Sequence, residues 1–198
     1  MKEPEDAQRL EAYLPRELLT RFGETVDEAA YAARGAVARY IRTLATLDAE
    51  TLSQPISPGK WSPIGFTDHL RKVTQIHIAD IRLVMSGGRA TRPVPGLIDD
   101  EGRLIVTVPG AEPGPELELA SLAPALLAVT AELIESVRFT VENGHEGKIV
   151  HVNPYFGELT PIGCLQLCAA HAHHHRKRHL LPLGRAQREA PPSTQGEQ

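Results

Sequence analysis

Hydrophobic residues recur at intervals of three and four positions in four stretches of the chain, and none of these stretches contains proline. The stretches are residues 16–54, 64–92, 125–153 and 162–181. Proline is excluded from helix interiors because it lacks an amide hydrogen and clashes with the preceding turn, and the three-to-four spacing is typical of an amphipathic helix. The sequence therefore predicts an all-α protein, a four-helix bundle in which residues 89–120 form a long crossover between the second and third helices.

Capping residues and glycines mark the ends of the predicted helices. Ser62 and Thr160 can each cap a helix N-terminus, and the proline that follows each of them suits the first helical position. Gly87, Gly144 and Gly184 mark the expected ends of the second, third and fourth helices. Within the crossover, residues 104–108 predict a short extended piece.

Composition and charge narrow the class of protein. The chain has 198 residues and a net charge of -4, from 21 basic and 25 acidic side chains. We expect one globular domain over residues 1–186, followed by a disordered tail over residues 187–198. The acidic balance argues against a general nucleic-acid-binding surface. No run of about 18 apolar residues and no apolar N-terminal segment is present, so we expect no membrane span and a cytoplasmic location.

The histidines provide the main candidate chemistry, because five of the nine fall between residues 171 and 179. His171 and His175 are four residues apart, which makes them neighbours on one otherwise apolar face of the last helix. Two buried imidazoles repel each other when protonated and lose solvation. A shared divalent metal resolves this conflict, since neutral imidazole is a good ligand. A chance occurrence of the same spacing is the alternative interpretation.

His69 is the candidate third ligand. It lies on the expected apolar stripe of the second helix, which we place at Phe66, His69, Val73, Ile76, Asp80 and Leu83. A single histidine on such a face can equally be a core residue with hydrogen-bond partners. If the second and last helices run antiparallel, however, His69 meets His171 and His175. The three then form a site with open coordination positions, as in catalytic metal sites.

The two cysteines of the chain are expected to be small core residues, which excludes a disulfide framework. Cys164 and Cys168 share the stripe of the last helix with the two histidines. Cys164 and His175 are 11 residues apart, or about 16 Å along a helix, so one ion cannot bind both. Cys168 paired with His171 is the single cysteine alternative.

His174 is the candidate catalytic residue, because it lies at the edge of the stripe, where it can hold a ligand or contact a substrate. A surface histidine is the alternative interpretation. His173 and His179 are expected at the solvated surface or the helix end. Asp80 lies about 16 Å along its helix from His69, so a buried polar contact or a dimer contact is expected there rather than a metal bond.

Three stretches of the chain together resemble the DinB/YfiT-like superfamily of metal-binding four-helix bundles. The first runs from Lys60-Trp61-Ser62-Pro63 to His69, and the second is Asn153 to Thr160, before the last helix. The third is His171-Ala172-His173-His174-His175, which is similar to an H-x-x-H-H signature. The resemblance covers about residues 25–182, in which His69 and His171 are 102 residues apart.

The resemblance implies an up-down-down-up helix order over a DinB-like domain at residues 1–186. It also implies a divalent metal, most often zinc or nickel, held by His69, His171 and His175, together with a small-molecule substrate and a homodimer. Relatives include thiol-dependent S-transferases, mycothiol-dependent isomerases and metal-dependent hydrolases. Many of them carry a glutamine one turn after the last histidine. Arg178 or His179 stands there in this chain, which leaves the substrate open.

Three functions follow as hypotheses. The first is a metal-dependent transferase that uses a low-molecular-weight thiol as cosubstrate, with the metal lowering the pKa of the thiol. The second is a hydrolase that uses a metal-bound hydroxide, for which Glu142 or Glu158 could supply a base if a loop folds over the site. The third is a non-enzymatic stress-response protein that binds a metal.

Overall fold

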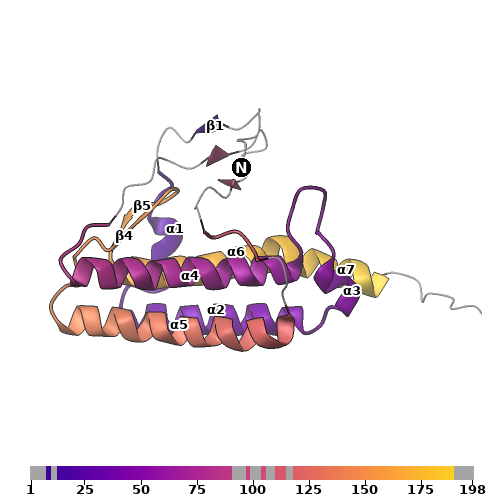
Figure 1. The fold of residues 1–198 in the computed structure, drawn as a ribbon, viewed down its shortest axis with the longest axis horizontal. Coiled ribbons are helices and arrows are strands. Elements are labelled where there is room, and N and C mark those ends of the chain that lie inside the picture. The colour runs from indigo at the N-terminus through magenta and orange to yellow at the C-terminus, as the bar shows by residue number, and fades with distance from the viewer. Residues whose placement is uncertain are drawn as a thin grey trace, which may run out of the picture.

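Four long helices form the body of the protein, as the sequence predicts (Figure 1). They are α2 (Val26–Leu44), α4 (Pro63–Met85), α5 (Leu119–Glu142) and α6 (Pro161–His175). The computed structural model describes residues 8–9, 13–90, 97–98, 104–105, 110–114 and 118–189. Within these ranges the protein is mainly helical, and the all-α prediction is confirmed.

Contacts near the helix ends establish the direction of three of the four helices. Gln166, in the first turns of α6, donates to the backbone oxygen of Gly23 just before α2 (2.6 Å). These two helices therefore run in the same direction. Near the end of α2, the Tyr40 hydroxyl lies 3.2 Å from that of Thr67, which is in the first turns of α4. Helix α4 therefore runs antiparallel to α2 and α6.

The third long helix, α5, runs parallel to α4. Arg82, near the end of α4, forms a 2.6 Å ion pair with Glu132 in the second half of α5. At the other end, Asp68 of α4 and Ser121 of α5 line the same groove. The order is therefore up-down-down-up, as the family resemblance implies, and the crossover has to return along the length of the bundle.

Helix caps form where the sequence predicts them. The Ser62 side chain accepts from the Gly65 amide (3.1 Å) at the start of α4, and the Thr160 side chain does the same for Gly163 (3.3 Å) at the start of α6. The first proline-free stretch, however, is not one helix. It is divided into α1 (Glu17–Thr20), α2 and α3 (Ala49–Ser53), because a capping box at Thr25 begins a new helix.

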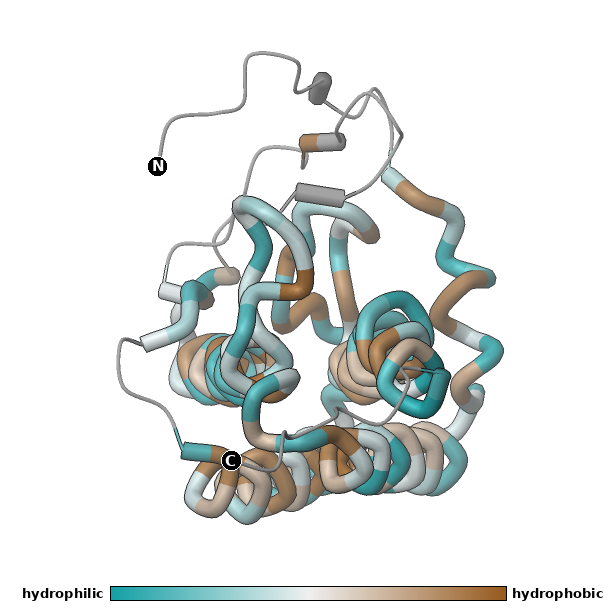
Figure 2. The backbone as a smooth tube through the Cα atoms, turned by 90° about the vertical axis from the view of Figure 1, so that its right-hand side faces the viewer, coloured by the Kyte–Doolittle hydropathy of each residue, from teal (hydrophilic) through white to brown (hydrophobic). Residues whose placement is uncertain are grey.

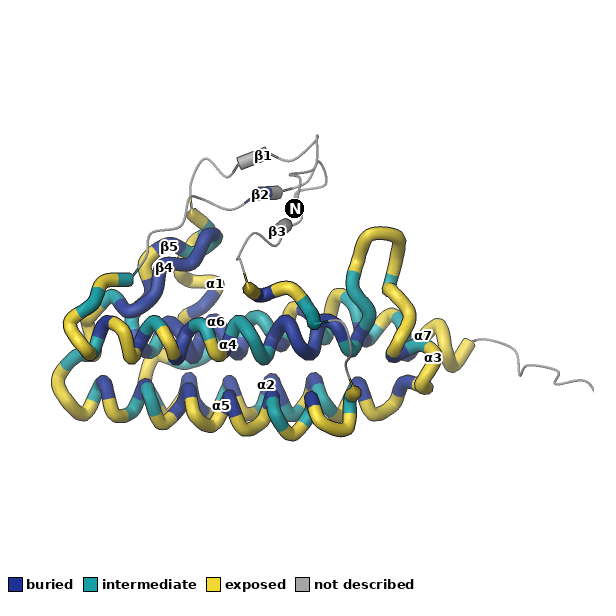
Figure 3. Tube along the Cα trace, in the orientation of Figure 1, coloured by how far each residue is buried: buried dark blue, intermediate teal, exposed yellow. Residues whose placement is uncertain are grey.

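The core lies between the helices, where their hydrophobic faces meet (Figures 2 and 3). The predicted stripe of α4 is wrong in its second half, since Leu83 is 45% exposed. The buried face there is Leu70, Thr74, His77, Ile78, Ile81 and Val84. The buried position 74 is hard to recognise because Thr74 is polar. Its hydroxyl donates to the Leu70 carbonyl (2.8 Å), so burial leaves no unpaired group.

The last helix continues past its predicted end at Gly184. After α6 the chain forms a π-helical turn, η1 (Arg176–Leu180), and then α7 (Leu181–Glu189). Proline at position 182 is tolerated because it falls in the first turn of α7, directly after the π-helical turn has interrupted the regular α-helical ladder. Of the predicted tail, residues 187–189 are helical, and residues 190–198 lie outside the described residues.

Short strands add to the bundle. β1 (Gln8–Arg9), β2 (Leu97–Ile98) and β3 (Leu104–Ile105) form a three-stranded antiparallel sheet. β3 is the start of the predicted extended piece, whose remaining residues 106–108 lie outside the described ranges. β4 (His151–Asn153) and β5 (Gly157–Leu159) form a hairpin that the sequence analysis did not predict. Figure 1 shows this hairpin and α1 at one end of the bundle, with α3 and α7 at the other.

Helix α5 is long and apolar enough to cross a membrane by length and composition alone, and it is the one such helix in the described part of the chain. A core helix of a soluble protein passes the same test. Here α5 packs along α4 and α2, and its buried side chains, among them Leu126, Leu133 and Val137, belong to the hydrophobic core.

Candidate metal centre

Three histidines converge at the end of the bundle where α4 begins and α6 ends. His69 comes from the first turns of α4, and His171 and His175 come from the last turns of α6. The Nε2 atom of His171 lies 3.2 Å from Nε2 of His69 and 2.9 Å from Nε2 of His175. The structure thus brings together the three residues that the sequence analysis proposed as ligands, and the antiparallel helices explain why they meet.

The spacing and chemistry of this triad fit a metal ion. One ring nitrogen from each of the three residues lies within 4.8 Å of the others. Two nitrogens that are each 2.0–2.1 Å from a tetrahedral zinc ion are separated by about 3.4 Å, which is close to the observed 2.9 and 3.2 Å. Nε2 of His171 carries either one hydrogen or one lone pair, so it can form a well-directed hydrogen bond with only one of its two neighbouring nitrogens, whereas a cation can bind all three.

A backbone carbonyl of the crossover fixes the orientation of His69. Nδ1 of His69 lies 2.8 Å from the carbonyl oxygen of Ala111, which is fully buried. The carbonyl can only accept, so Nδ1 carries the hydrogen and Nε2 keeps its lone pair toward His171. A carbonyl that holds the second ring nitrogen of a ligand in this way is typical of metal-binding histidines.

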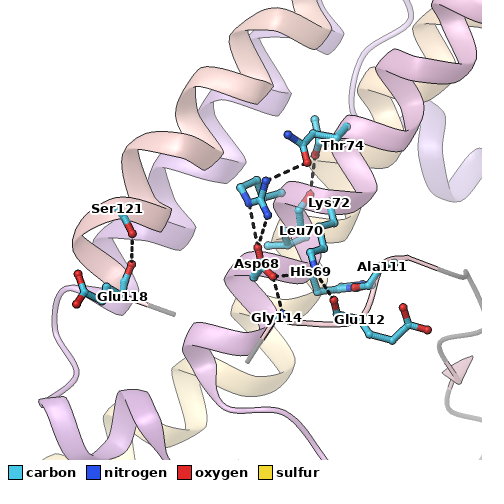
Figure 4. Close-up of polar contacts among 12 residues, drawn as sticks. Asp68, His69, Leu70, Lys72, Thr74, Ala111, Glu112, Gly114, Glu118 and Ser121 are labelled. Atoms are coloured by element: carbon cyan, nitrogen blue, oxygen red, sulfur yellow. Dashed lines mark hydrogen bonds and ion pairs between the residues drawn. The ribbon is translucent and has the colours of Figure 1, made fainter. Parts of the chain in front are cut away.

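The segment that carries this carbonyl is anchored to α4 at two further points (Figure 4). Lys72 donates to the Glu112 carbonyl (2.5 Å), and the buried Asp68 carboxylate accepts from the Gly114 amide (2.9 Å). Asp68 also accepts from Arg71 through two nitrogens, at 2.9 and 2.6 Å. Burial acts to raise the pKa of Asp68, but the bonds from Gly114 and Arg71 outweigh it and hold that pKa below its usual value. Asp68 is therefore an ionised anchor for the crossover.

Burial keeps the triad neutral. It lowers the pKa of His171 and of His175 well below the usual value, and the neighbouring histidines lower both further. Burial also lowers the pKa of His69, although the Ala111 carbonyl and the Asp68 charge oppose this effect. Neutral imidazoles at neutral pH are the form that a metal ion requires.

Aromatic rings enclose the triad on one side. Trp61 packs against His69 with ring centroids 4.9 Å apart, and Phe66 packs against His175 at 4.8 Å. Trp61 is the single tryptophan of the chain. Its fluorescence therefore provides a direct reporter of ion binding at this end of the bundle.

The other histidines of the cluster take different positions. His173 packs edge-on against Phe22 at 6.0 Å, away from the triad. His174 is exposed, and its ring lies 5.4 Å from that of His175. His179 was expected at a solvated helix end, and this prediction is wrong. The π-helical turn carries its ring onto Phe66, where the two stack at 4.5 Å.

Both cysteines are core residues, as predicted. Burial raises the pKa of Cys168 to about 11, although hydrogen bonds with Thr74 and Thr130 oppose the shift. Burial also raises the pKa of Cys164. Protonated thiols with such high pKa values are poor nucleophiles and poor metal ligands.

The helix order excludes two carboxylates from the triad. Glu142 ends α5 and Glu158 lies in the β4–β5 hairpin, both at the opposite end of the bundle from His171 (Figure 1). Neither can be the base that the hydrolase hypothesis requires. Glu112, in the crossover next to Ala111, is close enough for its charge to raise the pKa of His69, and its carboxylate accepts from the Gly110 amide (2.9 Å).

A second polar cluster, which the sequence analysis missed, lies further along α4. Asp80 accepts from Nδ1 of His151 in β4 at 2.6 Å, so Asp80 makes the predicted polar contact, although its own side chain is 25% exposed and only His151 is buried. The His151 ring packs edge-on against His77 at 4.6 Å. His77 is 1% exposed, and neither of its ring nitrogens has a hydrogen-bond partner among the described residues. His77 was overlooked because the predicted stripe of α4 followed Ile76.

We expect replacement of His77 with leucine to stabilise the metal-free protein, most of all at low pH. Burial lowers the pKa of His77 well below 6.5, so only the unfolded chain gains a proton as the pH falls. Through this residue, the free energy of unfolding of the wild-type protein therefore falls by up to about 2 kcal/mol between pH 8 and pH 5. At pH 8 the free energy of unfolding of the variant should exceed that of the wild-type protein by about 1 kcal/mol, because the variant has no unpaired polar atoms at this position. Urea unfolding at both pH values measures the two effects.

A His145→Leu variant is the control, since His145 follows α5 and lies outside the buried cluster. It should keep the pH dependence of the wild-type protein. An unchanged pH dependence in the His77 variant would contradict the assignment of His77 as a buried neutral group.

The structure is a four-helix bundle with a histidine site that could hold a metal ion. Comparisons with known proteins place it in a family. The sequence description of the DinB superfamily matches residues 32–177, and the chain belongs to this superfamily. No match was found among curated protein sequences. Among solved structures, the chain is similar to YfiT from Bacillus subtilis, described as a probable metal-dependent hydrolase with an unusual four-helix bundle topology. The TM-score is 0.56 at 17% identity, over 90% of this chain and 95% of YfiT.

Proposed function

We propose that this protein is a divalent-metal-dependent hydrolase of small molecules, with His69, His171 and His175 as the metal ligands. The convergence of their three Nε2 atoms is the observation that carries the proposal. Three protein ligands leave coordination positions open, which distinguishes catalytic from structural sites. The description of the structurally similar YfiT as a probable metal-dependent hydrolase also supports the proposal of a metal-dependent hydrolase.

Zinc or nickel is the proposed ion, because imidazole nitrogens suit both. When bound, such an ion lowers the pKa of a water molecule or of a thiol and polarises a substrate carbonyl. Three neutral ligands leave the full charge of the ion available for this effect. The protein contributes a fixed His69 tautomer, through Ala111, and an aromatic wall that limits access of water on one side.

Two side chains are proposed to move protons. The charge of Glu112 acts on His69 from the anchored crossover segment, and we assign Glu112 the role of general base once its exposed carboxylate leaves the Gly110 amide and turns toward the triad. His174, exposed beside His175, is the proposed proton carrier. Partial desolvation and the charge of Arg178 lower the pKa of His174, so its ring is neutral at neutral pH and takes up a proton from solvent before it returns one to the leaving atom.

Positive charge on the His179 side of the site favours an anionic substrate. Near His69 the charges of Asp68 and Glu112 affect its pKa more than that of Lys72, which is paired with Asp68. Burial lowers the pKa of His179 to about 4, and the charges of Arg178 and Lys60 contribute to this effect. A substrate carboxylate or phosphate would bind near Lys60 and Arg178.

Transfer to a low-molecular-weight thiol is the second candidate function. The same cations favour it, because the abundant thiols of the cytoplasm carry carboxylates. The thiolate would form at the open coordination positions and attack an electrophilic small molecule, so Glu112 would not be required. A Glu112→Gln variant separates the two reactions. It should lose most activity as a hydrolase and little as a thiol transferase.

The proposal is tested by removing the metal and restoring it. We expect the chelator-treated protein to lose nearly all activity toward anionic esters or amides, and stoichiometric zinc or nickel to restore it. Parallel assays measure the reaction of low-molecular-weight thiols with an electrophile such as an epoxide in the presence of the protein. Activity that survives complete metal removal contradicts the proposal. A metal-loaded protein without turnover in either assay would favour the non-enzymatic metal-binding function.

A further inference from the structure

A second group of three histidines lies next to the triad and shares one member with it. One ring nitrogen from each of His174, His175 and His179 lies within 4.8 Å of the others. The ring centroids are 5.4 Å apart for His174 and His175, 5.3 Å for His175 and His179, and 6.1 Å for His174 and His179. Among the described residues, only this group and the triad have this spacing.

The π-helical turn brings the group together. Residues five apart in an α-helix point about 140° away from each other, given 3.6 residues per turn. His174 and His179 are five apart, and five is the step of the π-helical hydrogen bond, which runs here from the Leu181 amide to the Arg176 carbonyl. Isolated π-helical turns are frequent at functional sites. In a regular helix His179 would have faced away from His174.

A buried nitrogen without a partner lies at the shared residue. His175 is 6% exposed, and its Nε2 atom faces His171 in the triad. Its Nδ1 atom is buried and has no hydrogen-bond partner among the described residues. His69 shows the usual arrangement, in which the second nitrogen bonds a carbonyl. A buried ring nitrogen left unpaired costs free energy, and a cation in the second group would give it a partner.

We propose that His174, His175 and His179 form a second divalent-cation site, which receives the ion from solvent and passes it to the triad. The two sites share the buried His175, and His171 and His179 are both half-buried, but the remaining ligand is exposed in the second site (His174) and buried in the triad (His69). An ion therefore reaches the second site first. His175 offers Nδ1 to the second site and Nε2 to the triad, so transfer of the ion from Nδ1 to Nε2 requires the ring hydrogen to leave Nε2 and a hydrogen to return to Nδ1, both through solvent.

Local charge favours transfer over occupancy of both sites at once. The positive charges of Lys60 and Arg178 lower the pKa of His179, and that of Arg178 also lowers the pKa of His174. None of the three ligands is a carboxylate that could offset a second divalent charge, and two divalent cations that share one imidazole repel strongly. The second site should therefore bind more weakly than the triad and empty into it.

Equilibrium dialysis with Ni²⁺ alone tests the existence of the site. A His69→Ala/His171→Ala variant lacks the triad but should still bind one ion per chain, more weakly than the wild-type protein. Adding His179→Phe should abolish this binding, because phenylalanine keeps the stack on Phe66 but offers no nitrogen. Adding His173→Ala instead should leave it unchanged. The second site is excluded if the double variant binds no ion, or if His179→Phe leaves binding intact. Circular dichroism checks that each variant is folded.

Stopped-flow loading of Ni²⁺ into metal-free protein tests the transfer, with Trp61 fluorescence as the signal. His179→Phe alone should slow loading by about tenfold, the size of effect that partners of a metal ligand produce, while the final content stays at one ion per chain. Unchanged loading rates would overturn the transfer role. The transfer role rests on the proposed triad, but neither measurement depends on hydrolysis. Failure of the triad itself would show separately, as a wild-type protein that binds Ni²⁺ no better than the double variant.

Discussion

Replacing His171 with alanine should lower the affinity for zinc or nickel by more than about 100-fold, since loss of a partner behind a ligand already costs 10–100-fold. His171 is the central member of the triad, because its Nε2 atom contacts those of both His69 and His175. Catalytic activity should fall to background at limiting metal. Ion titrations followed by Trp61 fluorescence, with metal analysis of the dialysed protein, measure the change.

The matched control is His173→Ala, which makes the same substitution on the same helix two residues away. His173 packs against Phe22 and belongs to neither histidine group, so its loss should leave metal affinity unchanged. A His171→Ala protein that binds one ion per chain with wild-type affinity would refute the triad. His69→Ala extends the test to α4, and the same large loss is expected there.

The Asp68→Ala variant should be destabilised and should also bind the metal more weakly. The buried carboxylate accepts from the Gly114 amide and from Arg71, and loss of such a partner costs about 1–3 kcal/mol of folding free energy. Without this anchor, the Ala111 carbonyl no longer holds His69 in position. Metal affinity should therefore fall by about 10–100-fold. Urea unfolding of the metal-free protein and ion titration of the folded protein measure the two effects separately.

Asp80→Ala separates positioning from general destabilisation. Asp80 lies on the same helix and also loses a buried partner, His151, so its folding free energy should fall by a similar amount. Its contacts are with the hairpin at the far end of the bundle, and its metal affinity should stay at the wild-type value. Equal losses of affinity in both variants would show that Asp68 acts only through stability.

The sequence predicted the features that depend on local pattern. Ser62 and Thr160 cap their helices because each is followed by proline and an apolar run. The triad could be predicted because His171 and His175 are one turn apart on one helix. To add His69 as the third member, it was enough to assume that α4 and α6 are antiparallel. The parallel course of α5, by contrast, has no local signature, and it came from the family resemblance alone.

The features that sequence analysis missed depend on tertiary context. Thr74 and His77 are polar, so a pattern of hydrophobic residues does not place them in the core. The π-helical turn after His175 changes the register by one residue, which no periodic pattern anticipates. The contacts of Ala111 and Gly114 with α4 are made by backbone atoms, and backbone atoms leave no trace in residue identity.

The parallel arrangement of α4 and α5 has a consequence for how this site can diverge. The crossover returns along the bundle and contributes one backbone carbonyl to the candidate metal centre, from Ala111, 42 residues after His69. A carbonyl contact does not depend on the side chain at that position, and the entropic cost of a longer loop grows only slowly with its length. The crossover can therefore gain, lose or exchange residues between its ends while the ligand geometry persists. If the proposed enzymatic function holds, substrate preference could change through this segment without any change to the four helices or their histidines.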